Sequence, residues 1–294
     1  MAPPWCSSSH LPRSLVDEWL GQDTGLLDLT TIMLGIQDVG AEATLVSRER
    51  IVACGVCEAA AVYEAAGAAV IRAQREGAWL EPGAVLLRAR GPAGALHRAW
   101  RVAQTLAAIG SAVATETRRL VEEARKANPR VIVAVARKAP PGLRGLYYRC
   151  VLAGGASLHR MGLGDTVLVF PQHYRLLPGG LEEALERLRE ARSLAGERRI
   201  VVETATRDEA LLAAGSGVVD EIQLDHMEPR ELARLAEEIR RLAPGVKIAV
   251  GGGIAVGNVA LYAPHVDVVV TSAPYWARPA DLTTRITPLK PRGR

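Results

Sequence analysis

The 294-residue chain lacks several features that would assign it to other functional classes. No apolar run approaches the roughly 20 residues of a transmembrane helix, and residues 1–10 lack the apolar stretch of a signal peptide. The net charge is only +4 and the basic residues are dispersed, which argues against a nucleic-acid-binding surface. We therefore expect a cytoplasmic protein with small-molecule partners.

Lysine, asparagine and cysteine are scarce. Four of the 36 basic residues are lysines, which leaves 32 arginines; arginine suits carboxylates and phosphates, but a GC-rich genome produces the same bias. Only Asn128 and Asn258 are asparagines, as is typical of thermophiles. Cys54 and Cys57 form one CxxC without a second pair, which favours idle buried thiols over a metal site, with a local disulfide as the alternative.

The chain changes character near residue 110. Residues 1–110 indicate an α+β companion domain, residues 111–280 a larger α/β domain, and residues 281–294 a C-terminal segment that packs back on the first domain. In the first part we expect helices over 13–20, 57–69 and 96–110 and strands over 44–52 and 85–89.

The second part repeats a β-branched run, a loop and an amphipathic helix. Nearly continuous apolar strands between helices predict a parallel sheet that is buried on both faces. The helices are expected over 180–194, 207–214 and 228–242. Six such units can close into an incomplete TIM-like barrel or lie as an open sheet. The six strands are expected over 131–136, 166–170, 199–203, 219–224, 246–250 and 266–271.

Cations gather where strands of this sheet meet their loops. In both architectures the chemistry belongs at the C-terminal ends of the strands. Arg137 and Lys138 follow the first strand, and His159 and Arg160 precede the second after a pair of glycines. Alone, the first pair could be a solvated surface pair and the second could be structural, but together they favour an anion-binding site.

Two acids end neighbouring buried strands. Glu203 and Asp225 each follow an apolar run, and a carboxylate there must find a partner or face a ligand because unpaired burial is costly. They could accept hydrogen bonds from ribose hydroxyls, hold Mg²⁺ through water or offset a developing cation. The alternative is salt bridging to arginines of the barrel.

The last two strand–loop junctions predict a phosphate site. Gly251, Gly252 and Gly253 follow the fifth strand, and a helix expected directly after them would direct free N–H groups at an anion. The sixth strand leads into Thr271, Ser272 and Ala273. Phosphate sites formed by the last two loops are common in barrels.

These residues, in this order, resemble the quinolinate phosphoribosyltransferase (nicotinate-nucleotide pyrophosphorylase) family. The likeness begins at Asp28-Leu29-Thr30-Thr31 and is most specific in 137–142, 159–163, Leu224-Asp225 and the glycine triplet. Residues 168–173 and 270–281 are similar to one branch, the ModD-type pyrophosphorylases found with molybdate-transport genes.

The resemblance implies an N-terminal sandwich domain, an incomplete barrel, and a homodimer, or a higher oligomer, in which Arg101 reaches the partner's site. Mg²⁺ is expected to arrive with the phosphoribosyl pyrophosphate donor, near the two acids and without a direct protein ligand. The resemblance places the acidic ring substrate and pyrophosphate at Arg137, Lys138, His159 and Arg160, the ribose at Glu203 and Asp225, and the 5′-phosphate at Gly252, Gly253 and Ser272.

The chain departs from the family pattern at the substrate ring. Phe170 stands where the family carries a lysine, and Ala136 and Ala139 stand where it carries threonines. One lost charge-assisted bond is worth roughly 1.5–3 kcal/mol. The resemblance therefore implies a less anionic or more apolar ring beside Phe170, with phosphoribose recognition intact.

The first hypothesis is phosphoribosyl transfer to a ring nitrogen, with Glu203, Asp225 and Lys138 as catalytic residues. A second is a ModD-type accessory protein of molybdate uptake that binds an oxyanion without turnover, against which the two carboxylates argue. A third, a sugar-phosphate lyase or isomerase, needs a lysine inside the barrel; apart from Lys138 the candidate is Lys247, which begins a strand.

Overall fold

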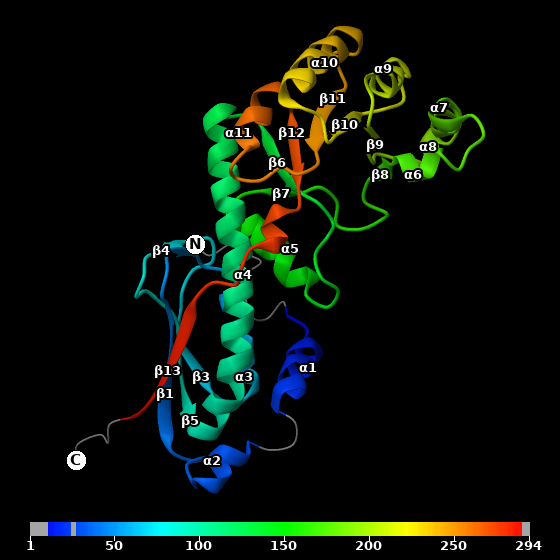
Figure 1. Ribbon diagram of the computed structural model, residues 1–294. Coiled ribbons are helices and arrows are strands. Elements are labelled where there is room, and N and C mark those ends of the chain that lie inside the picture. Colours follow the sequence, from blue (N-terminus) through cyan, green and yellow to red (C-terminus); the bar gives the residue numbers. More distant parts are fainter. Residues whose placement is uncertain (1–10, 25–27, 290–294) are drawn as a thin grey trace. The chain divides into compact units, whose positions relative to one another are not determined.

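The computed structural model describes residues 11–24 and 28–289, which divide into two compact units (Figure 1). Among them, the first unit runs to Arg118, resumes at Ala139–Gly155 and ends with the chain from Trp276 on. The second comprises Arg119–Lys138 and Ala156–Tyr275. Residues 1–10, on which the signal-peptide expectation rests, lie outside the described residues. No helix of the described part is long and apolar enough to cross a membrane.

The first unit is built on a four-stranded antiparallel sheet. Its central strand β1 alternates buried and more exposed residues, so one face of the strand packs on the core. The last strand, β13, pairs with β1, so the first and last strands of the described chain are neighbours in one sheet. The sheet order is β13 (Leu282–Pro288), β1 (Gly40–Ser47), β5 (Val85–Pro92) and β3 (Ala69–Ala73).

The helices of the first unit follow the sequence pattern, with one extension. The helix expected over 13–20 is confirmed, the one expected over 57–69 ends earlier, at Ala65, and the long helix begins earlier and ends later than the expected 96–110. The strand expected over 44–52 is divided into β1 and the short β2 (Ile51–Val52), which pairs with β4 (Trp79–Leu80). The helices are α1 (Arg13–Thr24), α2 (Leu29–Met33), α3 (Val56–Ala65), α4 (Ala93–Ala127) and α5 (Arg144–Gly154).

The expectation for the cysteines was wrong. Cys54 is neither idle nor bonded to Cys57, because it forms a disulfide with Cys150 of α5, 96 residues later. Both cysteines are fully buried. Gly110 of α4 lies against the two, and a Cβ there would stand 3.0 Å from the Cys150 sulfur and from the Cys54 carbonyl. Close packing against α4 therefore brings Cys54 and Cys150 together. The spacing of the two cysteines in the CxxC cannot reveal this.

The second unit holds a seven-stranded sheet in which every pairing is parallel. The six predicted strands are confirmed in place, but the count of six was wrong because β7 has only two residues and no β-branched run. No ladder among the described residues joins the terminal strands β7 and β8, so the barrel is incomplete. The order is β7 (Ser157–Leu158), β6 (Ile132–Val135), β12 (Val268–Thr271), β11 (Lys247–Gly251), β10 (Glu221–Asp225), β9 (Ile200–Thr204) and β8 (Val167–Val169).

Short and long helices alternate with these strands (Figure 1). The helix expected over 228–242 is α10, and it buries Leu232, Leu235 and Ile239, as the helical spacing predicts. The helix expected over 180–194 is interrupted at Ala191. The helices are α6 (Pro171–Tyr174), α7 (Gly180–Glu190), α8 (Arg192–Ala195), α9 (Arg207–Gly215), α10 (Pro229–Leu242) and α11 (Val259–Tyr262).

The register of the parallel sheet aligns the C-terminal ends of its strands. Asp225 on β10 pairs with Gly251 on β11, and Gln223 pairs with Glu203 on β9. Thr271 at the end of β12 pairs with Val135 of β6. Because parallel strands point the same way, the residues that follow them collect at one edge.

The disulfide predicts a non-additive pair of substitutions. Cys54→Ala and Cys150→Ala each remove the same crosslink, so each is expected to lower the free energy of unfolding by about 2–4 kcal/mol. The double variant should lose little more than either single variant. Urea denaturation under oxidising conditions measures this, and losses that simply add would show that the crosslink is absent.

Candidate active site

Two guanidinium groups and one aromatic ring meet at the C-terminal edge of the parallel sheet. Arg160, which follows β7, is buried, and its guanidinium lies 5.6 Å from the ring centroid of Phe170 at the end of β8. Burial and the charge of Arg137 lower the pKa of Arg160. The Nε atom of Arg137, after β6, is itself buried. Two partly buried guanidinium groups whose charges act on each other suit an anionic ligand.

Phe170 is held in place by its own loop. Its ring is stacked on that of His173, with centroids 5.6 Å apart and planes 17° apart, and its N–H donates to Nδ1 of His173 at 2.9 Å. The half-buried ring therefore offers a fixed aromatic surface beside Arg160.

The two predicted acids share one electrostatic environment. Glu203 accepts a hydrogen bond from Nε2 of Gln223 at 2.6 Å. Burial, followed by the charge of Asp225, raises the pKa of Glu203 to about 7, while His226 and Lys138 act in the opposite direction. Glu203 therefore lies within reach of the charges of Asp225, His226 and Lys138.

His226 was missed by the sequence reasoning. It follows Asp225 directly, and its Nδ1 lies 2.7 Å from the Asp225 carboxylate. Its φ is 52°, in the left-handed region that non-glycine residues rarely adopt. A histidine next to the acid at a strand end was the available signal, but the pattern does not reveal the backbone conformation.

The glycine turn differs from the expectation. Gly252 and Gly253 have φ values of 90° and 65°, which suits glycine, but no helix follows directly. Asn258 closes the loop instead: its Oδ1 accepts the N–H of Ala255 at 2.8 Å and its Nδ2 donates to Gly253 at 3.1 Å. The four-residue α11 begins only at Val259, so an anion here would meet the amides of the turn rather than a long helix dipole.

In the loop after β12, two residues of the predicted phosphate site, Thr271 and Ala273, form hydrogen bonds within the protein. The Thr271 hydroxyl donates to the Ile254 carbonyl at 2.6 Å and accepts the N–H of Ala273 at 3.0 Å. These bonds tie the β11 and β12 loops together. Ser272, between Thr271 and Ala273, is half-buried, and its hydroxyl takes part in neither bond.

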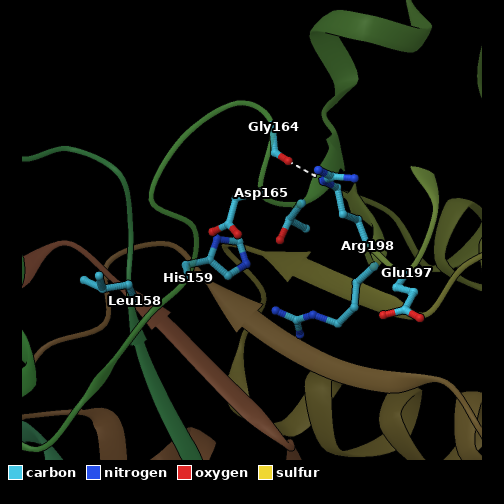
Figure 2. A pocket seen from close by; sticks show the side chains of 8 residues that line it. Leu158, His159, Gly164, Asp165, Glu197 and Arg198 are labelled. Atoms are coloured by element: carbon cyan, nitrogen blue, oxygen red, sulfur yellow. Dashed lines mark hydrogen bonds between the residues drawn. The ribbon is translucent and has the colours of Figure 1, made fainter. Parts of the chain in front are cut away.

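His159 has a different neighbour from Arg160. Its Nε2 lies 3.9 Å from the carboxylate of Glu221, a fully buried residue at the start of β10. Arg199 donates to the same carboxylate at 2.6 Å. Figure 2 shows His159 beside Asp165 among the residues that line a cavity of about 520 Å³. Because Glu221 begins β10 and Asp225 ends it, His159 lies at the opposite end of this strand from Asp225. The other lining residues are Leu158, Gly164, Thr166, Glu197 and Arg198.

Arg101 belongs to the first unit, unlike the other predicted site residues. It is exposed on α4, and its guanidinium lies 3.9 Å from the ring centroid of Trp100.

A metal centre built by the protein alone does not fit the second unit. No group of three or more His, Cys, Asp or Glu side chains in the described part of the chain could hold a metal ion. Glu203 and Asp225 supply only two carboxylates, and Glu203 is partly protonated near neutral pH. Mg²⁺ there would therefore need most of its ligands from a bound phosphate compound.

Comparison with known proteins gives a consistent result over most of the chain. Residues 28–109 match the family described as quinolinate phosphoribosyl transferase, N-terminal domain, and residues 113–285 match its C-terminal domain. A protein of Rhodobacter capsulatus, whose name assigns it as a pyrophosphorylase, ModD, is 37% identical over 242 residues, which cover 81% of this chain and 91% of that protein.

The human nicotinate-nucleotide pyrophosphorylase (carboxylating) is 32% identical over 268 residues, 91% of this chain and 88% of the human one. The solved structure of the nicotinate-nucleotide pyrophosphorylase from Francisella tularensis has the same fold, with a TM-score of 0.84, 22% identity, and 96% of this chain and 99% of that chain covered.

Glu203 predicts a pH-dependent stability. Because its pKa rises from an ordinary 4.5 to about 7, the native state keeps a proton that the unfolded state releases between these values. The free energy of unfolding therefore falls as pH rises through that window and stays reduced above it. Glu203→Gln removes this pH dependence. Relative to wild type, the free energy of unfolding of the variant should therefore rise by about 1–2 kcal/mol between pH 4.5 and 8, a value reduced to allow for the partial exposure of Glu203.

Urea denaturation at pH 4.5, 6 and 8 measures the difference. Loss of the hydrogen bond between the Glu203 carboxylate and Gln223 changes the free energy of unfolding by the same amount at all three pH values. Only the way in which the difference from wild type varies with pH is therefore diagnostic. Glu186→Gln, on the exposed side of α7, is the matched control and should follow wild type. A constant offset of Glu203→Gln across the three pH values would contradict the raised pKa.

Proposed function

Since the chain belongs to the quinolinate phosphoribosyltransferase family, we propose that it transfers the phosphoribosyl group of phosphoribosyl pyrophosphate to a ring nitrogen of an acidic heterocycle. One observation carries the proposal. The Arg137/Arg160 cations, the Glu203/Asp225 acids and the glycine turn all lie at or just after the C-terminal ends of strands of one parallel sheet.

The acceptor ring binds beside the paired guanidinium groups. An acidic substituent of the ring is held by Arg137 and Arg160, and the ring itself lies against Phe170. Support comes from the human relative, whose name indicates a carboxylating nicotinate-nucleotide pyrophosphorylase. The acceptor is quinolinate or a related ring; an aromatic wall at Phe170 favours a ring with fewer acidic groups.

The donor is held by its two ends. The 5′-phosphate binds the amides of Gly252 and Gly253 with Ser272, and the ribose faces Glu203 and Asp225. Lys138 and Arg137 bind the pyrophosphate together with Mg²⁺. When bound with the donor near Glu203 and Asp225, Mg²⁺ would supply positive charge to the leaving pyrophosphate.

The chain's own residues then stabilise a charge separation. The bond between ribose C1 and the pyrophosphate oxygen breaks, its electron pair leaves with pyrophosphate, and the ring nitrogen supplies the pair of the new C1–N bond. Asp225 and Glu203 offset positive charge at C1, while the cations offset negative charge on the leaving pyrophosphate. If quinolinate is the acceptor, a carboxylate then leaves as CO₂ and the ring carbon takes up a proton from solvent.

A second subunit completes the proposed site. Exposed Arg101 on α4 is proposed to reach the acidic ring in the partner subunit of a homodimer. The alternative of oxyanion binding without turnover has weaker support. The ModD relatives are themselves named as pyrophosphorylases, and the Glu203/Asp225 pair repels an oxyanion such as molybdate.

Turnover is the first test. Purified protein with phosphoribosyl pyrophosphate, Mg²⁺ and a panel that includes quinolinate, nicotinate and other heterocyclic acids is expected to release pyrophosphate with at least one acceptor. Arg137→Ala should lower kcat/KM by about 10²-fold or more because it removes a charge from the leaving-group site. Arg234→Ala, an exposed arginine of α10, is the control. Absence of pyrophosphate with every acceptor, and of donor binding in calorimetry, would contradict the proposal.

Mixed dimers test the shared site. Arg101→Ala and Arg137→Ala proteins, each inactive alone, are expected to regain up to about a quarter of wild-type activity when mixed, because a quarter of the sites formed then contain neither substitution. Steady-state rates after mixing and subunit exchange measure this. If exchange is verified with tagged subunits and activity does not return, Arg101 acts within its own subunit or not at all.

A further inference from the structure

The backbone at His226 is held in an unusual conformation. It is the one non-glycine residue with positive φ, at 52°, in the described part of the chain. Asn and Asp tolerate this region better than histidine does, and such outliers persist where surrounding structure enforces them, often at ligand sites. No role in the fold explains an exposed imidazole there, since 73% of its side-chain surface is accessible.

The turn after the neighbouring strand β11 leaves room for this imidazole, because Gly252 has no side chain. The N–H of His226 donates to the carbonyl of Gly251 at 3.1 Å, which fixes the turn after β10 to the end of β11. A Cβ on Gly252 would lie 2.6 Å from Cγ and Nδ1 of His226, far too close for any side chain. The imidazole therefore lies directly over the glycine turn, at the proposed position of the 5′-phosphate.

The ring is oriented by an acid. Nδ1 lies 2.7 Å from Oδ2 of Asp225, and in the tautomer whose Nδ1 carries the hydrogen this carboxylate accepts it, which leaves Nε2 free on the other side of the ring. Glu203 on β9 is close enough that Asp225 and His226 both act on its pKa, in opposite directions. The imidazole of His226 is thus held between Asp225, which is proposed to face the ribose, and the glycine turn, which is proposed to bind the phosphate.

We propose that His226 is a further binding residue of this site, whose Nε2 contacts the ribose 5-phosphate part of the donor. The inference rests on the proposed function, because it assigns a ligand contact within the phosphoribosyl site. It goes beyond that function by giving a role to a residue outside the predicted set.

The test uses ribose 5-phosphate as the probe, without Mg²⁺ or acceptor. Isothermal calorimetry compares the full-length wild type with His226→Asn and His226→Ala. Asparagine accepts the left-handed backbone and can still donate to Asp225, but it lacks Nε2. Both variants are expected to raise Kd by about tenfold or more, the loss expected for a hydrogen bond to a charged group. His265→Asn, a histidine remote from the C-terminal strand ends, should bind as wild type does.

A second probe locates the contact. Weaker binding of inorganic phosphate as well as ribose 5-phosphate by His226→Asn places Nε2 on the phosphate. Weaker binding of ribose 5-phosphate alone places it on a ribose hydroxyl. Both results support the proposal, and thermal denaturation verifies that each variant is folded.

Two results would overturn the inference and leave the proposed function standing. If wild type binds ribose 5-phosphate and both variants bind it equally well, Nε2 makes no contact. If only His226→Ala is weakened, His226 merely positions Asp225. Failure of wild type to bind either ribose 5-phosphate or phosphoribosyl pyrophosphate would instead reject the proposed function itself. Should His226→Ala not fold, the comparison of His226→Asn with wild type decides.

Discussion

The parallel register of β9, β10 and β11 is the constraint on which the candidate site depends. It sets Glu203 beside Gln223 and Asp225 beside Gly251, so acids and glycine amides that are far apart in sequence share one edge. A slip of one residue would turn every side chain of a strand to the other face. The apolar residues that bury these strands therefore also fix the distances among the polar groups that follow them.

That arrangement concentrates charge of both signs in a small, partly buried space. Burial, followed by the charge of Asp225 on the adjacent strand, raises the pKa of Glu203 towards neutrality, while burial, followed by the charge of Arg137, lowers the pKa of Arg160. Each group is unfavourable without an oppositely charged ligand. In phosphoribosyl transfer the donor is anionic and the transition state carries positive charge at the ribose. Such a reacting ligand would compensate the charges of the arginines and of the acids.

Several parts of the site could not be read from the pattern for definite physical reasons. β7 is too short to show a strand period, and the loop after Gly253 is closed by a side chain rather than by a helix. His159 stands next to Arg160 in the sequence, yet its side chain contacts Glu221 at the start of β10. The left-handed turn at His226 depends on the space that a glycine leaves on the neighbouring strand.

The sequence by itself determined the parallel α/β class, the places of six strands and the cations and acids that follow them, because apolar periodicity is a local property. It also contained the family motifs. Only the tertiary structure decided which groups meet: Cys54 with Cys150, His159 with Glu221, and an imidazole with Gly252. These contacts join residues distant in the chain, and their choice rests on close packing between elements, which no local pattern encodes.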